Sequence, residues 1–220
     1  MKRYLLILSL QTIMLLASGQ AKIVNQLDSR ELNAILENRR VTLIDVRTYS
    51  EFANGHIEAA GQLNYYAFDF RKKLLLLPKD KPVYLYCNTG YRSMKAAEFL
   101  LENGYEQVYN LERGIMEWEL FDLAVVVEPD ARPDTKHKME PDEYFALLKS
   151  VRPVLIDFYA PWCGPCRQMM PMIDSLKTAY AGKIDVIKIN ADASKKLVKE
   201  LQVWSVPHFS LFQNGTEIFS

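Results

Sequence analysis

The stretch Val154-Leu-Ile-Asp-Phe-Tyr-Ala160, followed by Trp162-Cys163-Gly164-Pro165-Cys166, decides the fold of the second half of the chain. The first segment is a short apolar run with β-branched and aromatic residues, which predicts a buried strand. The cysteine pair stands at the start of a predicted helix. Its sulfurs can close into a small disulfide ring, and the helix N-terminus stabilises the Cys163 thiolate. Strand, tight loop, cysteine pair and helix in this order predict a redox site.

Two cysteines at this spacing are also half of a zinc site, so a metal is the alternative to weigh. The chain has three cysteines, and no second pair accompanies Cys163 and Cys166. Its three histidines, His56, His137 and His208, are scattered along the sequence. We therefore expect neither a metal ion nor a cofactor.

The composition is that of an ordinary globular protein. The 220 residues are 49% hydrophobic and 25% charged, which suits one or two domains. The formal net charge is +0, so nothing indicates nucleic acid or an anionic membrane surface as a partner. Three cysteines are too few for a disulfide scaffold, and apolar cores must hold the fold.

The N-terminus has the pattern of a signal peptide. A basic start, Met1-Lys-Arg-Tyr4, leads into an apolar run that ends at Leu16, and small residues follow. The run is shorter than the roughly 20 residues that span a bilayer, although an uncleaved anchor is the alternative. With cleavage after Gly19 or Ala21, we expect residues 1–21 to be removed. The mature protein would then be soluble and exported, in the periplasm, which is an oxidising space.

The first domain, residues 22–126, alternates helical and strand patterns. A helix is expected over residues 27–36, with Asp28 or Ser29 as the N-cap. Short apolar runs at residues 41–46, 82–86 and 108–111 predict strands, and a helix is expected from Met94 to Asn103, ended by Gly104. This alternation predicts an α/β domain with a parallel sheet.

Cys87 follows one of these strands, at the position where open α/β sheets place their sites. Its loop runs into a helix N-terminus, so several backbone N–H groups point at one spot and bind an anion. Gly90 allows backbone dihedrals closed to other residues, and Arg92 offers a donor fork for an anionic substrate. A thiolate in such a cradle suits attack on an anionic sulfur donor. The alternative is a buried structural thiol.

This domain resembles the rhodanese family of sulfurtransferases. The resemblance rests on five segments: residues 43–47, Glu51-Phe52, Gly55-His56-Ile57, Tyr86-Cys-Asn-Thr-Gly-Tyr-Arg-Ser93 and Gly114-Ile-Met-Glu-Trp118. It implies that Cys87 carries a persulfide and that Asp45 and Arg47 support the site. The implied cradle consists of Asn88, Thr89, Gly90, Tyr91, Arg92 and Ser93. The resemblance also implies that the six-residue loop from Cys87 to Arg92 favours sulfur, because family members with a longer loop handle larger phosphate-like oxyanions. His56 is expected to be a structural hydrogen-bonding residue.

A charged, proline-bearing linker is expected at residues 127–138, and the second domain at residues 139–220. Helices are predicted at residues 141–149, 163–180 and 194–201, and strands at residues 183–189 and 208–213. Asn214-Gly215 predicts a hairpin turn with a return strand after it.

The second domain resembles thioredoxin, which carries the same WCGPC motif. The resemblance implies that Cys163 is the attacking and more exposed thiol, and that Cys166 resolves the mixed disulfide. Asp157 matches a buried acid that accepts the Cys166 proton, with Lys188 as its cationic neighbour. Trp162 shields the pair, and Pro207 stands where the family has a cis-proline that docks the partner's backbone. The resemblance also implies a final helix after the hairpin, so we expect the sequence to Ser220 to be a fragment or truncated product, or that face of the sheet to be covered by something else.

Persulfide formation at Cys87 and dithiol–disulfide exchange at Cys163 and Cys166 on one chain together predict a thiol–disulfide oxidoreductase coupled to sulfur transfer. The expected partners are a small sulfur donor such as thiosulfate, protein thiols or disulfides, and a membrane electron donor. The alternative is an exported protein-disulfide reductase whose first domain is only a docking module. A third interpretation is a binding module without enzymatic activity.

Overall fold

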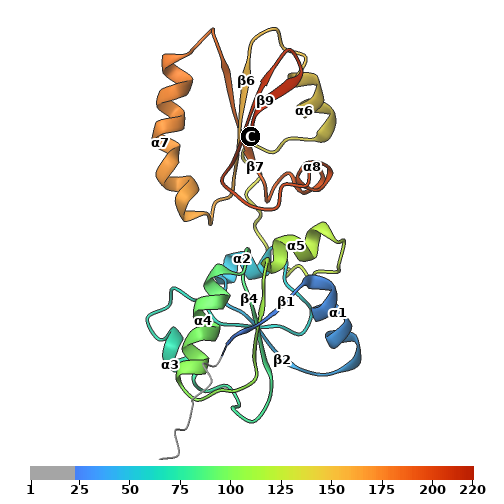
Figure 1. The fold of residues 1–220 in the computed structure, drawn as a ribbon, viewed down its shortest axis with the longest axis vertical. Helices are drawn as coiled ribbons and strands as arrows, with labels where there is room; N and C mark the ends of the chain where they lie inside the picture. Colours follow the sequence, from blue (N-terminus) through green and yellow to red (C-terminus); the bar gives the residue numbers. More distant parts are fainter. Residues whose placement is uncertain (1–22) are drawn as a thin grey trace, which may run out of the picture.

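Residues 23–220 are described by the computed structural model, and they form two α/β domains stacked along the long axis of the molecule (Figure 1). The predicted signal peptide, residues 1–21, lies outside this range. Among the described helices, none is long and apolar enough to cross a membrane.

The first domain is built on a parallel sheet of five strands in the order β1-β5-β4-β2-β3. The strands are β1 (Asn25–Leu27), β2 (Thr42–Asp45), β3 (Gly61–Gln62), β4 (Val83–Tyr86) and β5 (Val108–Leu111). The predicted parallel sheet is therefore confirmed. The two edge strands, β1 and β3, were not predicted, because segments of three and two residues are too short to show a period of two.

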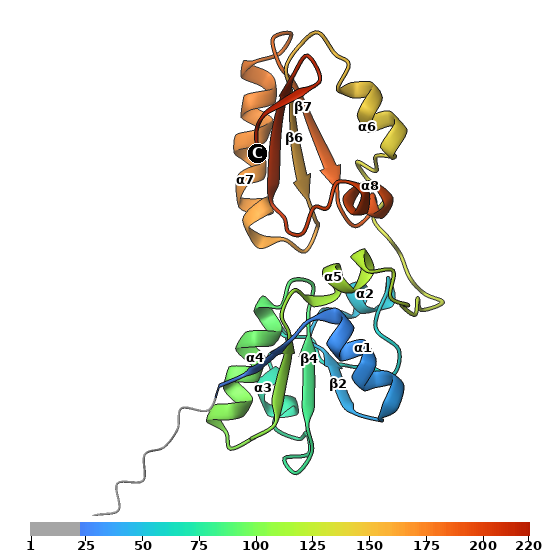
Figure 2. The same ribbon diagram turned by 45° about the vertical axis from the view of Figure 1, so that its right-hand side comes forward.

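Helices cover both faces of this sheet (Figure 2). They are α1 (Ser29–Asn38), α2 (Tyr49–Ala53), α3 (Phe70–Leu74), α4 (Tyr91–Glu102) and α5 (Gly114–Leu120). One apolar cluster joins the sheet to α3 and α4 through Phe70, Leu74 and Leu100. A second joins its other face to α1 and α5 through Leu32 and Trp118.

Local signals explain where two of these helices begin. Asp28, not Ser29, is the N-cap of α1, since its carboxylate accepts from the Glu31 N–H at 2.8 Å. Helix α4 begins at Tyr91, three residues before the predicted Met94. Gly90 has φ +81°, which lets the chain turn directly from the Cys87 loop into the helix.

The second domain has a mixed sheet in the order β7-β6-β8-β9, comprising β6 (Val154–Tyr159), β7 (Asp185–Asn190), β8 (His208–Gln213) and β9 (Thr216–Phe219). β6 runs parallel to β7 and antiparallel to β8, and the Asn214-Gly215 hairpin joins β8 to β9 as predicted. Helix α7 (Gly164–Ala179) covers one face, while α6 (Pro141–Leu147) and α8 (Lys195–Glu200) cover the other (Figures 1 and 2). β9 is the last described element.

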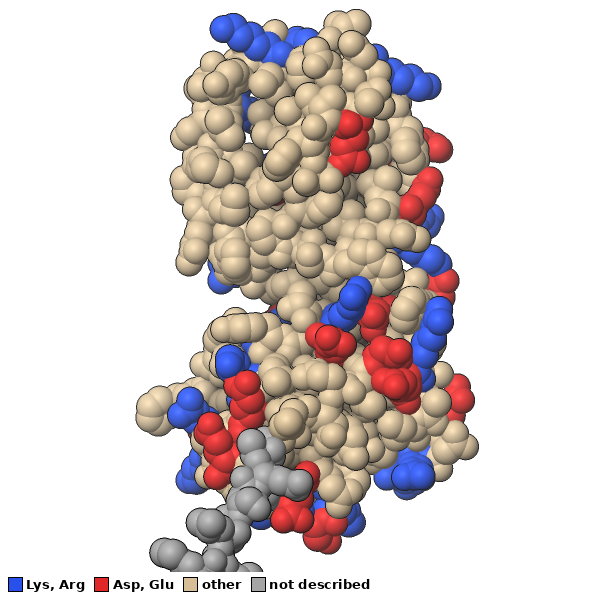
Figure 3. Space-filling view, viewed as in Figure 1, with Lys and Arg blue, Asp and Glu red and all other residues tan. Residues whose placement is uncertain are grey.

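The segment between the domains follows the surface of the first domain before it enters the second. Val126 pairs with His56, whose N–H donates to the Val126 carbonyl at 2.9 Å. The Tyr49 hydroxyl lies 3.2 Å from the Asp130 carboxylate. Figure 3 shows acidic and basic side chains gathered at the junction of the two domains. The loops that follow β4 and β6 both face this junction, which places the two cysteine sites on facing surfaces.

Candidate active site

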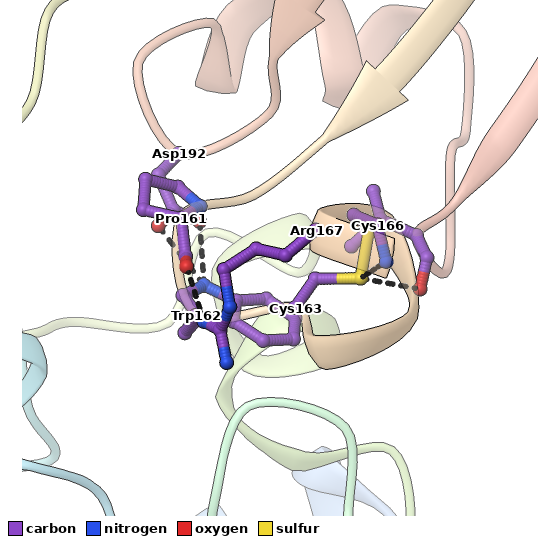
Figure 4. The surroundings of a disulfide bond; sticks show 7 residues. Pro161, Trp162, Cys163, Cys166, Arg167 and Asp192 are labelled. Atoms are coloured by element: carbon purple, nitrogen blue, oxygen red, sulfur yellow. Dashed lines mark hydrogen bonds between the residues drawn. A yellow bond between two sulfur atoms is a disulfide. The ribbon is translucent and has the colours of Figure 1, made fainter. Parts of the chain in front are cut away.

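The Cys163–Cys166 pair forms a disulfide at the N-terminus of α7 (Figure 4). Cys163 is the N-cap residue, and its sulfur accepts the Cys166 N–H at 3.1 Å. The same sulfur lies 3.7 Å from the Val206 carbonyl oxygen. The helix N-terminus therefore points at the Cys163 sulfur, where it would stabilise a thiolate.

The expectation that Cys163 is more exposed than Cys166 is wrong in this disulfide state. The two residues are equally buried, at 3% and 4% exposure. Trp162, Met170 and Val206 pack against the buried cluster that contains both cysteines.

Trp162 is held by a partner that the sequence did not reveal. Its indole N–H donates to the Asp192 carboxylate at 2.9 Å, and Arg167 donates to the Pro161 carbonyl at 2.8 Å (Figure 4). Desolvation raises the pKa of Asp192 to about 6, against the lowering effect of the Trp162 hydrogen bond. Asp192 lies in a turn after β7, 30 residues from Trp162. No local pattern marks that relationship.

Asp157 occupies the middle of β6 and is 3% exposed. Burial raises its pKa from 3.8 to about 6, while the neighbouring Lys188 acts to lower it. Lys188 lies opposite Asp157 in the sheet register and forms an ion pair with Asp174 of α7. Pro207 follows a cis peptide bond, as the sequence resemblance implied, and adjoins the Val206 carbonyl beside Cys163.

The Cys87 loop is built from backbone contacts. Cys87 is 1% exposed, and the Ser93 hydroxyl lies 3.5 Å from its sulfur. The first turn of α5 binds the loop, because Ile115 N–H donates to the Cys87 carbonyl at 2.8 Å. A Cβ on Gly90 would lie 1.8 Å from the Glu112 carbonyl oxygen, and one on Gly114 would lie 2.3 Å from that of Cys87. Both glycines are therefore required by close backbone approach.

Asp45 and Arg47 lie beside this loop, as expected. The Arg47 guanidinium contacts Asp45 at 2.6 Å and donates to the Asn88 side chain at 3.1 Å. Burial alone would lower the pKa of Arg47, but the Asp45 carboxylate outweighs this effect and raises it. This buried pair fixes the start of the cradle.

Arg92 does not stand free as a donor for an anion. Its guanidinium binds Glu51 at 2.7 Å, and the Asn88 side chain donates to the same carboxylate at 2.7 Å. Burial acts to raise the pKa of Glu51, but the Arg92 hydrogen bond lowers it below the ordinary value. The pairing of Glu51 was not foreseen, although its segment was singled out.

The remaining predicted residues have simpler surroundings. Thr89 is half-buried and the Tyr91 side chain is 69% exposed, so Tyr91 reaches away from the sulfur. His56 stacks on Phe52 and lies 3.1 Å from its carbonyl, which confirms a structural role.

A cavity of about 650 Å³ lies between the domains. Its walls include Arg47, Glu51 and Asn88 from the Cys87 side, and Pro161, Trp162, Arg167 and Asp192 from the disulfide side. Residues next to both predicted sites therefore border one space, although Cys87, Cys163 and Cys166 are not among its lining residues.

Comparison with known proteins identifies each half of the chain separately. The family model described as Rhodanese-like domain matches residues 28–120, and the model described as Thioredoxin matches residues 135–220. Thioredoxin 1 of a Nostoc species is 40% identical over 72 residues, which cover 33% of this chain and 67% of that protein. The chain belongs to the thioredoxin family. Its thioredoxin domain follows a rhodanese-like domain.

Two further relatives represent the two halves. Chloroplastic thioredoxin X of Arabidopsis thaliana is 43% identical over 72 residues, which are 33% of this chain and 40% of that protein. The chain thus spans less than half the length of thioredoxin X. The structure of a rhodanese-like domain protein from Staphylococcus aureus is 30% identical to the rhodanese-like half, covering 48% of this chain and 99% of that one, with a TM-score of 0.42.

Proposed function

We propose that the protein is a thiol–disulfide oxidoreductase coupled to sulfur transfer. The Cys87 thiolate attacks the outer sulfur of a donor such as thiosulfate, which forms a Cys87 persulfide and releases sulfite. The Cys163 thiolate takes that outer sulfur and frees Cys87. Cys166 then attacks the Cys163 sulfur and expels hydrosulfide, and the two electrons of the dithiol are retained by the sulfide.

The shared cavity is the observation that carries this proposal. Asn88, next to Cys87, and Trp162, next to Cys163, both line it. The cavity thus joins the chain neighbours of Cys87 and Cys163, and the proposal requires the Cys87 persulfide and the Cys163 thiolate to meet across it. Transfer between tethered groups needs no diffusional encounter, and its effective concentration is high.

In this proposal Asp157 is the group that accepts the proton from Cys166. A carboxylate whose pKa is raised to about 6 by burial is matched to proton transfer near neutral pH. Asp157 would take the proton as Cys166 becomes a nucleophile. Protein thiols or a membrane electron donor would return the disulfide to the dithiol, whereas a protein disulfide would take electrons from the dithiol.

The test is the sulfide released when fully reduced, reductant-free protein meets excess thiosulfate. We expect about one hydrosulfide per chain, because each dithiol supplies two electrons once. The Cys163→Ser variant should instead hold a persulfide on Cys87 and release none. Equal release from both proteins would refute the coupling.

Two observations favour the second candidate, a thioredoxin-like protein-disulfide reductase with a docking rhodanese domain. Cys87 is 1% exposed, and Arg92 is already paired with Glu51. In that case the Cys87→Ser variant would retain full disulfide reductase activity, and no persulfide would form on the native chain.

We also propose that the protein is exported to the periplasm. The basic start and apolar run of residues 1–21 support this location. N-terminal sequencing of the mature protein tests it, and we expect a start at Gln20 or Lys22.

A further inference from the structure

Two ion pairs clamp the rhodanese-like domain onto the thioredoxin domain. Lys195 of α8 lies 2.5 Å from Glu119 of α5, and Lys199 of α8 pairs with Asp122. Lys195 and Lys199 are four residues apart and share one face of α8. Glu119 lies in α5 and Asp122 lies two residues beyond its end, so the two pairs join the C-terminal end of α5 to that face.

An aromatic contact extends the clamp toward the disulfide. The Phe121 and Trp204 rings lie 6.3 Å apart, and the Arg113 guanidinium stands 5.6 Å from the Trp204 ring. Leu120 packs against the core cluster of the thioredoxin domain.

The clamped residues adjoin the groups that touch the Cys163–Cys166 pair. Trp204 precedes Val206, whose carbonyl lies 3.7 Å from the Cys163 sulfur, by two residues. Lys195 follows Asp192, the partner of Trp162, by three residues. Trp162, next to Cys163, also borders the same cavity as Arg47 and Glu51, so the rhodanese-like domain faces the surface beside Cys163 that a protein substrate would approach.

We propose that the docked rhodanese-like domain makes the thioredoxin disulfide selective for low-molecular-weight thiols and disulfides over folded proteins. The selectivity rests on the thiol–disulfide exchange proposed above. The interdomain cavity of about 650 Å³ is large enough for a molecule the size of cystine, since ligand sites commonly measure 300–1,000 Å³. A folded protein reaches Cys163 only after the clamp opens.

The exchange itself is the same for both substrate sizes. The Cys163 thiolate attacks one sulfur of the substrate disulfide, which forms a mixed disulfide and releases one thiolate. Cys166 attacks the Cys163 sulfur and releases the second thiolate. The enzyme loses two electrons, and the substrate disulfide gains them. Only the approach to Cys163 differs.

The experiment compares two disulfides with one reduced protein. Pre-reduced protein is mixed with cystine or with insulin, and the two second-order rate constants are measured. Glu119→Lys with Asp122→Lys replaces both attractions by repulsion. We expect this double variant to raise the ratio of the insulin rate to the cystine rate about tenfold. The ratio is compared because Glu119 also borders the cavity that would hold cystine. Adding Lys195→Glu and Lys199→Glu restores opposite charges and should return the insulin rate to the native value.

The matched control is Asp80→Lys with Glu102→Lys, which makes the same charge change at exposed positions away from the junction. It should change neither rate. Salt provides a test without mutation, because exposed ion pairs are screened at high ionic strength. Sodium chloride should raise the insulin rate of the native protein more than that of the double variant.

Each outcome decides the proposal. Native protein that reduces insulin as fast as the double variant and shows no salt effect overturns the selectivity, while thiol–disulfide exchange stands. Native protein that reduces neither disulfide overturns the proposed exchange itself.

Discussion

The Trp162 indole N–H donates to the Asp192 carboxylate across 2.9 Å, and this bond ties the residue before Cys163 to the turn that leads into α8. Asp192 borders the interdomain cavity, and Lys195, three residues later, holds Glu119 of the other domain. The immediate neighbour of the attacking thiol is therefore connected to the domain junction.

Trp162→Phe should raise the pKa of Asp192 above its native value of about 6. The indole hydrogen bond stabilises the charged carboxylate and so lowers the pKa. Without this donor, desolvation, which favours the neutral carboxyl group, raises the pKa further. The measurement is an NMR titration of the Asp192 carboxyl carbon in both proteins. A pKa that falls in the variant would contradict the hydrogen bond.

Asp157→Asn should stabilise the protein at pH 8. The folded pKa is raised from 3.8 to about 6, so the folded state binds the proton more tightly than the unfolded state. The charged carboxylate therefore destabilises the folded state. This effect is absent below the unfolded pKa of 3.8, grows as the pH rises, and is complete above the folded pKa of about 6. The expected gain is on the order of 3 kcal/mol at pH 8.

Urea unfolding at pH 8 and pH 3.5 measures this gain. The difference between variant and native protein should nearly disappear at the lower pH. Asp142→Asn, at an exposed position of α6, is the control and should leave the stability within about 0.5 kcal/mol at both pH values.

Gly90→Ala should disrupt the Cys87 loop. Its Cβ would lie 1.8 Å from the Glu112 carbonyl oxygen, at a φ of +81°. We expect a loss of roughly 3 kcal/mol or more and faster alkylation of Cys87, because strain and overpacking add. Gly164→Ala is the control, since a Cβ there meets nothing within 4 Å. Equal stability of the two variants would show that the loop adapts.

Glu51→Gln should free Arg92 at a cost in stability. The two side chains are 9% and 13% exposed, and a cation left without its buried partner costs about 3 kcal/mol. The Glu51 pKa is lowered in the folded state, so this loss is full above its unfolded pKa of 4.5 and shrinks as the pH falls below it.

The same variant should form the Cys87 persulfide several-fold faster at low thiosulfate, because a negative charge is removed beside the cradle. Mass spectrometry of the persulfide measures this rate. Glu98→Gln, from the exposed pair with Lys95, is the control for both effects. A slower rate in Glu51→Gln would mean that Glu51 is needed to orient Arg92.

Local patterns predicted most of the fold and the chemistry-bearing residues. Strand β6, the cysteine pair and the Asn214-Gly215 turn each carry their signal within a few residues. Relations across long separations could not be predicted in this way. Asp192 reaches Trp162, and Glu51 reaches Arg92, only through the tertiary fold. The burial of Cys163 also depends on Val206, which lies 43 residues further along the chain.

Helix α5 limits how the two halves can be separated. Its first turn is bonded to the backbone of the Cys87 loop, and Leu120 at its other end completes the apolar core of the following domain. A rhodanese-like domain from another protein without an apolar side chain at this place would leave that part of the thioredoxin core uncovered. Cutting the chain between the two domains would therefore remove an apolar contact from the thioredoxin core.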